Sequence, residues 1–126
     1  MLTDLRVSSF HETEPVGVTT VQAMFLNAAA TGISSLDAPA MLEALLTIEQ
    51  RFGRERPYPY APRTIDLDLI LFGDAVINTA RLTVPHPRFR ERTFVLGPLS
   101  EIAPDWIDPV TGKTVAELFE ELRHEL

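Results

Sequence analysis

The chain contains the stretch Arg63-Thr64-Ile65-Asp66-Leu67-Asp68-Leu69-Ile70-Leu71-Phe72, in which two carboxylates stand two residues apart within an otherwise strand-like run. Side chains of a β-strand alternate between its two faces, so we expect Asp66 and Asp68 to project to the same side. Two acids held this close repel each other and are costly to bury unless a cation lies between them. The pair suits Mg²⁺, which takes one or two protein carboxylates and completes its shell with water and phosphate oxygens. Taken alone, the short Asp-x-Asp pattern is more often a half-exposed strand with two solvated acids.

Length and composition indicate one globular domain covering residues 1–126. The apolar fraction of 45% and the charged fraction of 23% are ordinary for such a domain, and the length suffices for a single core. The sequence has no cysteine, so it offers neither disulfides nor thiolate metal ligands. No apolar run reaches membrane-spanning length, and the amino terminus lacks the basic and apolar regions of a signal peptide. We therefore expect a cytoplasmic protein that does not bind membranes.

The distribution of charge points to a small anionic ligand. The net charge of -7 argues against general binding to nucleic acids. Much of the positive charge nevertheless lies between residues 51 and 92, in Arg51, Arg54, Arg56, Arg63, Arg81, Arg88, Arg90 and Arg92. An arginine fork grips two phosphate oxygens at once, so this cluster suggests a small polyphosphate. A set of surface ion pairs with the many glutamates is an equally good interpretation.

Two strands are predicted in the first third of the chain. Residues 5–13 alternate loosely between apolar and polar side chains, and the following Glu14-Pro15-Val16-Gly17 starts a loop. Residues 25–33 are alanine-rich, but their short length and Gly32 near their end favour a strand over a helix. Residues 54–62 hold three prolines and no period, so we expect a loop there.

The clearest helix is predicted over residues 37–53. Asp37 can cap it, Pro39 fits its first turn, and Gly53 can end it. The apolar stripe expected to face the core consists of Met41, Leu45, Ile48 and Phe52, widened by Leu42 and Leu46. Glu49 lies in the last turn, where the helix dipole slightly disfavours an acid, which hints that this side chain has another use.

The rest of the chain adds a hairpin and two helices. Gly73-Asp74 is expected to turn the Asp-x-Asp strand back into residues 75–78. Residues 82–87 are extended because their prolines exclude helix. Helices are predicted from Arg90 to Leu99 and from Val115 to Leu122. This order indicates an α+β sandwich with helices packed on an antiparallel sheet.

Four segments carry a resemblance to a known family. They are Gly53-Arg54-Glu55-Arg56, Ala61-Pro62-Arg63-Thr64-Ile65-Asp66-Leu67-Asp68, Arg81-Leu82-Thr83-Val84-Pro85-His86-Pro87 and Arg92-Thr93-Phe94. In this order and spacing they closely resemble the hydroxymethyldihydropterin pyrophosphokinase (HPPK) family, over nearly the whole chain. The resemblance implies a ferredoxin-like version of the α+β sandwich.

Members of this family transfer the pyrophosphoryl group of ATP to the hydroxymethyl oxygen of a reduced pterin and release AMP, in folate biosynthesis. The resemblance thus implies ATP and a pterin as ligands, with two Mg²⁺ ions held between the aspartates and the triphosphate. It makes Asp66 and Asp68 the metal ligands. It assigns contacts with phosphate to Arg54 and Arg56, in the loop predicted over residues 54–62, and to Arg63, which follows that loop. The positions that it places around ATP are Glu49, Arg81, Thr83, His86 and Arg92.

On the pterin side the resemblance assigns Thr13, Pro15, Val16, Phe25, Asn27 and Phe94. The first three would form a backbone rim, the asparagine a hydrogen-bonding amide, and the two aromatic rings a flat apolar slot. Tyr60 is the candidate for an aromatic residue that the family carries in its loop. Taken singly, the aromatic residues are more often core residues, Asn27 a turn former and His86 a capped loop residue.

The family normally opens with a strand, a Gly-Ser-Asn loop and a long helix before the segment that matches Val7, so the chain is truncated relative to it. Without an inner strand, its neighbours expose backbone groups and an apolar face. We therefore expect a gap in the sheet or a strand from a second copy, and so a homo-oligomer. An internal start site, a completed dimer and a degenerate relative remain open. The last would be a non-catalytic nucleotide-binding, metal-binding or assembly module.

Overall fold

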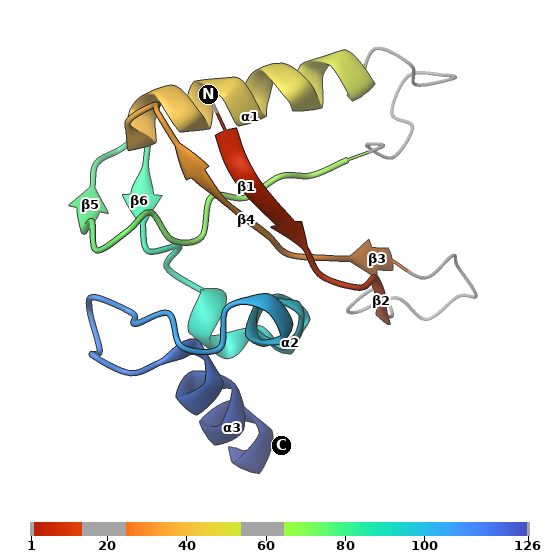
Figure 1. Ribbon diagram of the computed structural model, residues 1–126, viewed down its shortest axis with the longest axis vertical. Coiled ribbons are helices and arrows are strands. Elements are labelled where there is room, and N and C mark those ends of the chain that lie inside the picture. The colour runs from red at the N-terminus through yellow and green to blue at the C-terminus, as the bar shows by residue number, and fades with distance from the viewer. Residues whose placement is uncertain (1, 14–24, 54–64, 126) are drawn as a thin grey trace.

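Figure 1 shows the computed structural model of the chain, which describes residues 2–13, 25–53 and 65–125. In order, its elements are β1 (Leu2–Val7), β2 (His11–Thr13), β3 (Phe25–Asn27), β4 (Ala30–Ser34), α1 (Ala38–Gly53), β5 (Ile77–Asn78), β6 (Thr83–Val84), the 3-10 turn η1 (Phe89–Glu91), α2 (Thr93–Ile102) and α3 (Val115–Glu125). This mixture of helices and antiparallel strands confirms the predicted α+β class. Within these residues, no helix has both the length and the apolar character needed to cross a membrane.

The strands of the first third form one long hairpin that is interrupted in the middle. β1 pairs with β4, and β2 pairs with β3, both antiparallel. Between these ladders the Ser8 N–H donates to the Ala29 carbonyl oxygen at 2.8 Å, while the Ala29 N–H donates to the Ser8 hydroxyl at 2.9 Å. The prediction of continuous strands over 5–13 and 25–33 is therefore wrong in detail, because a hydroxyl replaces a backbone acceptor at this point.

Helix α1 begins and ends where its local signals place it. The Asp37 carboxylate accepts the N–H of Ala40 at 2.9 Å, and its carbonyl accepts the N–H of Met41 at 2.9 Å, which confirms the predicted cap. Ala38 is buried at the start of the helix. The predicted core-facing stripe is only partly correct, since Ile48 and Phe52 remain 41% and 44% exposed.

Residues 65–72 run through the middle of the molecule without a strand assignment, so the predicted Asp-x-Asp strand is wrong as a paired element. Their backbone is tied to a helix side chain and to a loop. The Leu67 N–H donates to the Glu49 carboxylate at 2.7 Å, and the Ile70 carbonyl accepts the His86 N–H at 2.9 Å. Figure 1 shows this segment between α1 on one side and α2 with α3 on the other.

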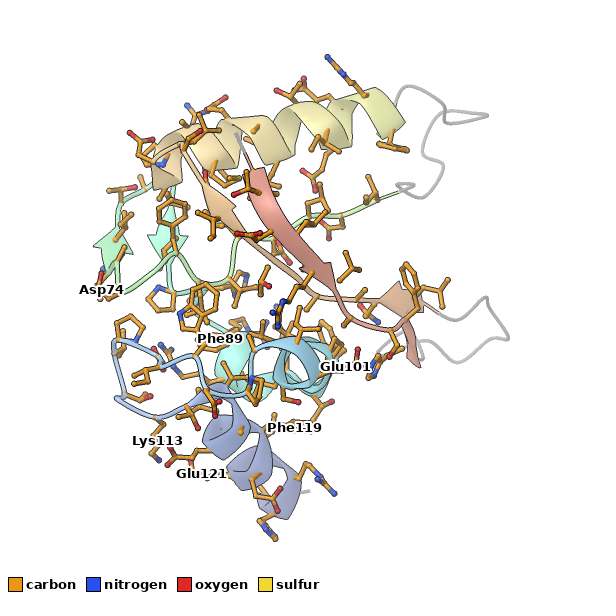
Figure 2. All side chains as sticks on the ribbon, in the orientation of Figure 1. Asp74, Phe89, Glu101, Lys113, Phe119 and Glu121 are labelled. Atoms are coloured by element: carbon orange, nitrogen blue, oxygen red, sulfur yellow. The ribbon has the colours of Figure 1, made fainter. Side chains whose placement is uncertain are left out.

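The turn at Gly73-Asp74 is present, but the hairpin predicted around it is wrong. The Ala75 N–H donates to the Phe72 carbonyl at 3.0 Å, and Gly73 has a positive φ of 55°, which glycine adopts readily. β5 then pairs with β6 and not with residues 65–72. Asp74 lies at the tip of this turn (Figure 2).

The main core lies between the last helices. Its buried members are Phe89, Leu96, Leu99, Val115 and Leu118. The second predicted helix starts later than expected, at Thr93, because residues 89–91 form a 3-10 turn. The third predicted helix is confirmed as α3, and its apolar face packs on this core. A smaller core, formed by Ala38, Leu82 and Val84, joins the start of α1 to the β5–β6 hairpin.

A buried ion pair fixes the loop between α2 and α3. Asp108 is fully buried and accepts hydrogen bonds from Arg90 Nε at 2.5 Å and Arg90 Nη2 at 2.9 Å. Thr111 Oγ1 and the Val110 N–H also donate to its carboxylate, at 2.8 and 3.0 Å. Burial alone would raise the pKa of Asp108, but these hydrogen bonds outweigh it and lower that pKa from 3.8 to about 2.

Candidate active site

The two aspartates of the Asp-x-Asp segment lie on the wall of a cavity of about 440 Å³. Asp66 and Asp68 are both exposed, whereas Leu67 between them is half-buried. The predicted projection of the two acids to one side is therefore supported by this alternation, although the backbone is not in a ladder. Asn27 and Phe94 line the same cavity. Residues from three distant parts of the sequence thus meet around one space.

The surroundings of the two aspartates are apolar over much of their area. Side chains from β1 and from the Asp-x-Asp segment itself contribute to the wall, including Leu2, Leu5, Val7, Leu69, Ile70 and Leu71. Such a site has a few polar groups on a largely apolar lining, which is typical of pockets that hold flat organic ligands. The aspartates supply the negative charge and Asn27 supplies a neutral amide.

His86 joins the Asp-x-Asp segment to the arginines of the following turn. The backbone N–H of His86 donates to the Ile70 carbonyl. The ring nitrogen Nδ1 of His86 accepts the backbone N–H of Arg88 at 3.2 Å. Burial lowers the pKa of His86 below its usual 6.5; the Asp68 carboxylate opposes this shift, and the charges of Arg92 and Arg88 add to it. Its ring is therefore neutral at neutral pH and lies within the electrostatic reach of both Asp68 and Arg92.

Arg92 stands at the junction of the predicted nucleotide and pterin positions. Its guanidinium lies 5.6 Å from the ring centroid of Phe94, in a cation–π arrangement. Phe94 is half-buried in the first turn of α2, and it both lines the cavity and lies beneath the Arg92 guanidinium. The structure thus brings together Asp66, Asp68, His86, Arg92, Asn27 and Phe94.

Arg81 and Thr83 lie apart from this group. Arg81 pairs with Glu43 of α1, and the arginine lines a second cavity, of about 330 Å³, at the start of that helix. Thr83 forms β6 with Val84 and pairs opposite Asn78. Neither residue is on the wall of the larger cavity. Of the predicted ATP positions, Glu49 reaches the backbone between the aspartates, His86 feels the charge of Asp68, and Arg92 is linked to them through its effect on His86.

Several predicted site residues lie outside the described residues: Pro15, Val16, Arg54, Arg56, Tyr60 and Arg63. Thr13 and Phe25 are described only as backbone positions, opposite each other at the end of the β2–β3 ladder. The described part of the site is a cavity wall formed mainly by the Asp-x-Asp segment, β1, the β3–β4 connection and the start of α2.

One contact near this wall was missed from the sequence. Glu101 of α2 accepts the N–H of Ser9 at 2.5 Å and the Ser9 hydroxyl at 2.6 Å, and it lies 3.5 Å from Nε2 of His11. Figure 2 shows Glu101 on the side of α2 that faces the β2 strand. The hydrogen bonds from Ser9 lower the pKa of Glu101. An acid in the last turn of a helix was the available signal, the same one that singled out Glu49.

The donor set at the Asp-x-Asp segment fits a hard divalent cation. Two exposed carboxylates on one wall offer oxygen ligands, which Mg²⁺ prefers, and leave the remaining positions of an octahedral shell to water and phosphate. Among the described residues, no group of three or more histidine, cysteine, aspartate or glutamate side chains is positioned to hold a metal. Asp66 and Asp68 are the described carboxylates that would hold such an ion in this cavity.

Comparison with known proteins identifies the family. A family model described as 7,8-dihydro-6-hydroxymethylpterin-pyrophosphokinase (HPPK) matches residues 1–104. The chain belongs to the HPPK family. This confirms the family predicted from the Asp-x-Asp and Arg81–Pro87 motifs.

Individual relatives agree with this membership. The chain is 48% identical over 117 residues to a 2-amino-4-hydroxy-6-hydroxymethyldihydropteridine pyrophosphokinase of Synechocystis sp., covering 93% of this chain and 59% of the relative. It is 48% identical over 101 residues to the Bacillus subtilis protein of the same name, covering 80% and 60%. It is 42% identical over 115 residues to that of Methylorubrum extorquens, covering 91% and 71%. The chain thus spans about three fifths of the length of the first two relatives.

Proposed function

We propose that this HPPK-family protein transfers the pyrophosphoryl group of ATP to the hydroxymethyl oxygen of 6-hydroxymethyl-7,8-dihydropterin and releases AMP, in folate biosynthesis. The observation that carries the proposal is the shared cavity. Two exposed carboxylates, a primary amide and an aromatic ring line one space that is large enough for a small organic substrate. Family membership favours this enzyme over a non-catalytic binding or assembly module.

The reaction needs alignment and charge neutralisation more than covalent work by the protein. The substrate hydroxyl oxygen loses its proton to solvent and forms a bond to the β-phosphorus. The bond from that phosphorus to the oxygen bridging to the α-phosphorus breaks, and AMP leaves with that oxygen. Asp66 and Asp68 would hold two Mg²⁺ ions, which supply positive charge for the triphosphate oxygens. Their exposure and common orientation leave room for phosphate oxygens in front of them.

On the nucleotide side, the proposed contacts combine cations and hydrogen-bond donors. Neutral His86 can donate one hydrogen bond without adding charge, and Arg92 can offer its fork to phosphate oxygens. The remaining residues proposed around ATP are Glu49, Arg81 and Thr83, with Arg54, Arg56 and Arg63 from the loop and its flank. The loop arginines would engage the transferring group, since charge builds on its oxygens as the bond breaks.

On the pterin side, the proposed slot is built from a ring and an amide. Phe94 provides an apolar face, and Asn27 can donate to and accept from a heterocycle edge. Phe25 would form the other face, and the backbone of Thr13, Pro15 and Val16 the rim. Arg92 on the Phe94 ring would link this slot to the phosphates.

Four further features belong to the same proposal. The α+β elements would belong to a ferredoxin-like sandwich. Residues 1–126 would lie within a single domain, and the protein would act in the cytoplasm. A second copy would cover the exposed apolar side chain of Ile33 on β4, which is 62% exposed and is not part of the cavity wall.

The test is pterin-dependent formation of AMP. The protein is incubated with ATP, MgCl₂ and 6-hydroxymethyl-7,8-dihydropterin, and AMP is measured against reactions that lack either the pterin or the protein. The proposal expects AMP release that requires both. AMP no greater than in the reaction without protein, together with binding of Mg-ATP, would instead favour the non-catalytic module.

A further inference from the structure

Glu49 is connected to the Asp-x-Asp segment by a direct hydrogen bond. It lies near the end of α1, and its Oε2 accepts the N–H of Leu67 at 2.7 Å across 18 positions of sequence. The bond is partly buried, and both residues are half-buried. Leu67 is the residue between the two aspartates. A helix side chain therefore reaches the centre of the proposed metal-binding pair.

This bond matters because, within the part of the chain that the structure describes, no strand pairing supports residues 65–72. Residues 65–72 have no strand assignment, so the regular ladder that normally fixes side-chain directions does not act on them. The peptide that Glu49 holds is the one that joins Asp66 to Leu67. Fixing its plane restrains the ψ angle of Asp66 and the φ angle of Leu67, and through them the relative directions of the two acids. The His86 contact at Ile70 restrains the segment only further along.

We propose that Glu49 is a positioning residue for the metal site: its carboxylate holds the Leu67 N–H so that Asp66 and Asp68 face the cavity together. The inference rests on the proposed function, in that the aspartates are taken as ligands of Mg²⁺. It is separate from the contact with ATP proposed for Glu49 above, because one carboxylate oxygen accepts the Leu67 N–H while a carboxylate has a second oxygen that can accept from another donor. A hydrogen bond to a charged acceptor is strong enough to select one backbone conformation.

The substitutions Glu49→Gln and Glu49→Ala separate the possible roles. The amide oxygen of glutamine can still accept the Leu67 N–H, although it carries no charge, whereas alanine removes the acceptor. A direct electrostatic role at the nucleotide depends on charge, so it would make the two variants alike. A positioning role depends on the acceptor, so the glutamine variant should retain most of it. Gln50→Ala, at the exposed neighbouring position of α1, is the matched control for changes in the helix.

The first measurement is binding of Mn²⁺, a paramagnetic substitute for Mg²⁺, followed by electron paramagnetic resonance. It is made on the protein with α,β-methylene-ATP, in which the bond that breaks in the reaction is blocked. We expect Glu49→Ala to weaken Mn²⁺ binding by about tenfold, which corresponds to loss of one hydrogen bond of ordinary net strength. Glu49→Gln should stay within about threefold of the unmodified protein, and Gln50→Ala should match it. Affinity for the analogue in the presence of EDTA should not change.

The second measurement is exchange of the Leu67 amide hydrogen, which needs neither metal nor turnover. Protection should be present in the unmodified protein and in Glu49→Gln, and lost in Glu49→Ala. Equal losses of Mn²⁺ affinity in the two variants would overturn the inference, as would unchanged affinity in Glu49→Ala despite lost protection. If Glu49→Ala does not fold, Glu49→Asp, which shortens the reach by one methylene, replaces it with the same expectations. Unmodified protein that binds no Mn²⁺ with the analogue and forms no AMP would reject the proposed function itself.

Discussion

At the scale of single residues, the proposed chemistry depends on the exposure of two acids beside a half-buried leucine. Asp66 and Asp68 line a cavity together with Asn27 and Phe94. The charge of Asp68 also acts on His86. Removing either carboxylate removes a ligand charge from an exposed position without opening a hole in the core. The loss should therefore appear in catalysis and not in folding.

Asp66→Asn and Asp68→Asn should each reduce the rate of AMP formation by at least about 100-fold, since even the partners of metal ligands cost about 10–100-fold when they are changed. The melting temperature should stay the same or rise, because a repulsive charge is removed. Steady-state rates over a Mg²⁺ titration check this, with Asp74→Asn, an exposed acid at the Gly73-Asp74 turn, as control. Wild-type rates at limiting Mg²⁺ in either variant would mean that the metal assignment is wrong.

Asp108 should make stability depend on pH at the acid end. Its pKa is lowered to about 2 in the folded protein, so the stabilisation is present above the unfolded value of 3.8. It is lost as the pH falls towards 2, and the shift corresponds to about 2 kcal/mol. Urea unfolding between pH 5 and about 2 checks this against Asp108→Asn, which should be less stable by about 3 kcal/mol at neutral pH. A variant whose stability fell with acid as steeply as that of the unmodified protein would contradict this origin.

Residue-scale features of the site could be predicted where they depend on neighbours in sequence. The common orientation of Asp66 and Asp68 needs only an extended backbone, and it holds although no strand forms. The position of Glu49 at the unfavourable end of a helix signalled another role, and its bond to Leu67 agrees with that signal. Glu101 carries the same signal in the last turn of α2, but its partner Ser9 lies 92 positions away, so no local pattern could identify that partner.

At the scale of elements, the helices were predictable and the strands were not. α1 carries its own cap and α3 its own apolar face, so both were found close to their true ends. A strand exists only where another strand lies beside it. Residues 65–72 have strand-like composition, but their Leu67 N–H meets a helix side chain and their Ile70 carbonyl meets a loop. For the same reason β5 could not be paired correctly from the Gly73-Asp74 turn alone.

The cap of α1 gives a prediction at this scale. Asp37→Ala should destabilise the protein by about 1 kcal/mol, because the Ala40 N–H loses its side-chain acceptor at the helix start. Asp37→Ser should cost less, since a hydroxyl can also cap. Thermal unfolding of both variants checks the effect, and equal melting temperatures for Asp37→Ala and the unmodified protein would show that the cap adds nothing.

At the scale of the whole molecule, the hairpin of β1 and β4 leaves apolar side chains in water. Leu5 and Ile33 are 59% and 62% exposed, and Leu5 also lines the 440 Å³ cavity beside residues 65–72. Exposed apolar side chains next to backbone that is not paired in a sheet favour association with another chain. The exposed side chains support the proposal of a homo-oligomer.

Sedimentation velocity at several concentrations checks the oligomer. The unmodified protein should sediment as a species larger than one chain, and Ile33→Lys should shift it towards the monomer by placing a charge in the contact. Val110→Lys, at an exposed apolar position in the loop before α3, is the control and should leave the sedimentation of the protein unchanged. A clean monomer at every concentration would reject self-association through β1 and β4.

The fate of the two transferred phosphorus atoms tests the central claim most directly. The protein is supplied with MgCl₂, the pterin and ATP that carries ³²P at either the β or the γ position, and the products are separated. Intact transfer predicts that both labels appear on the pterin in equal yield, in a one-to-one ratio with AMP. Label on the pterin from the γ position alone, with ADP as the other product, or release of both labels as free phosphate would contradict the account.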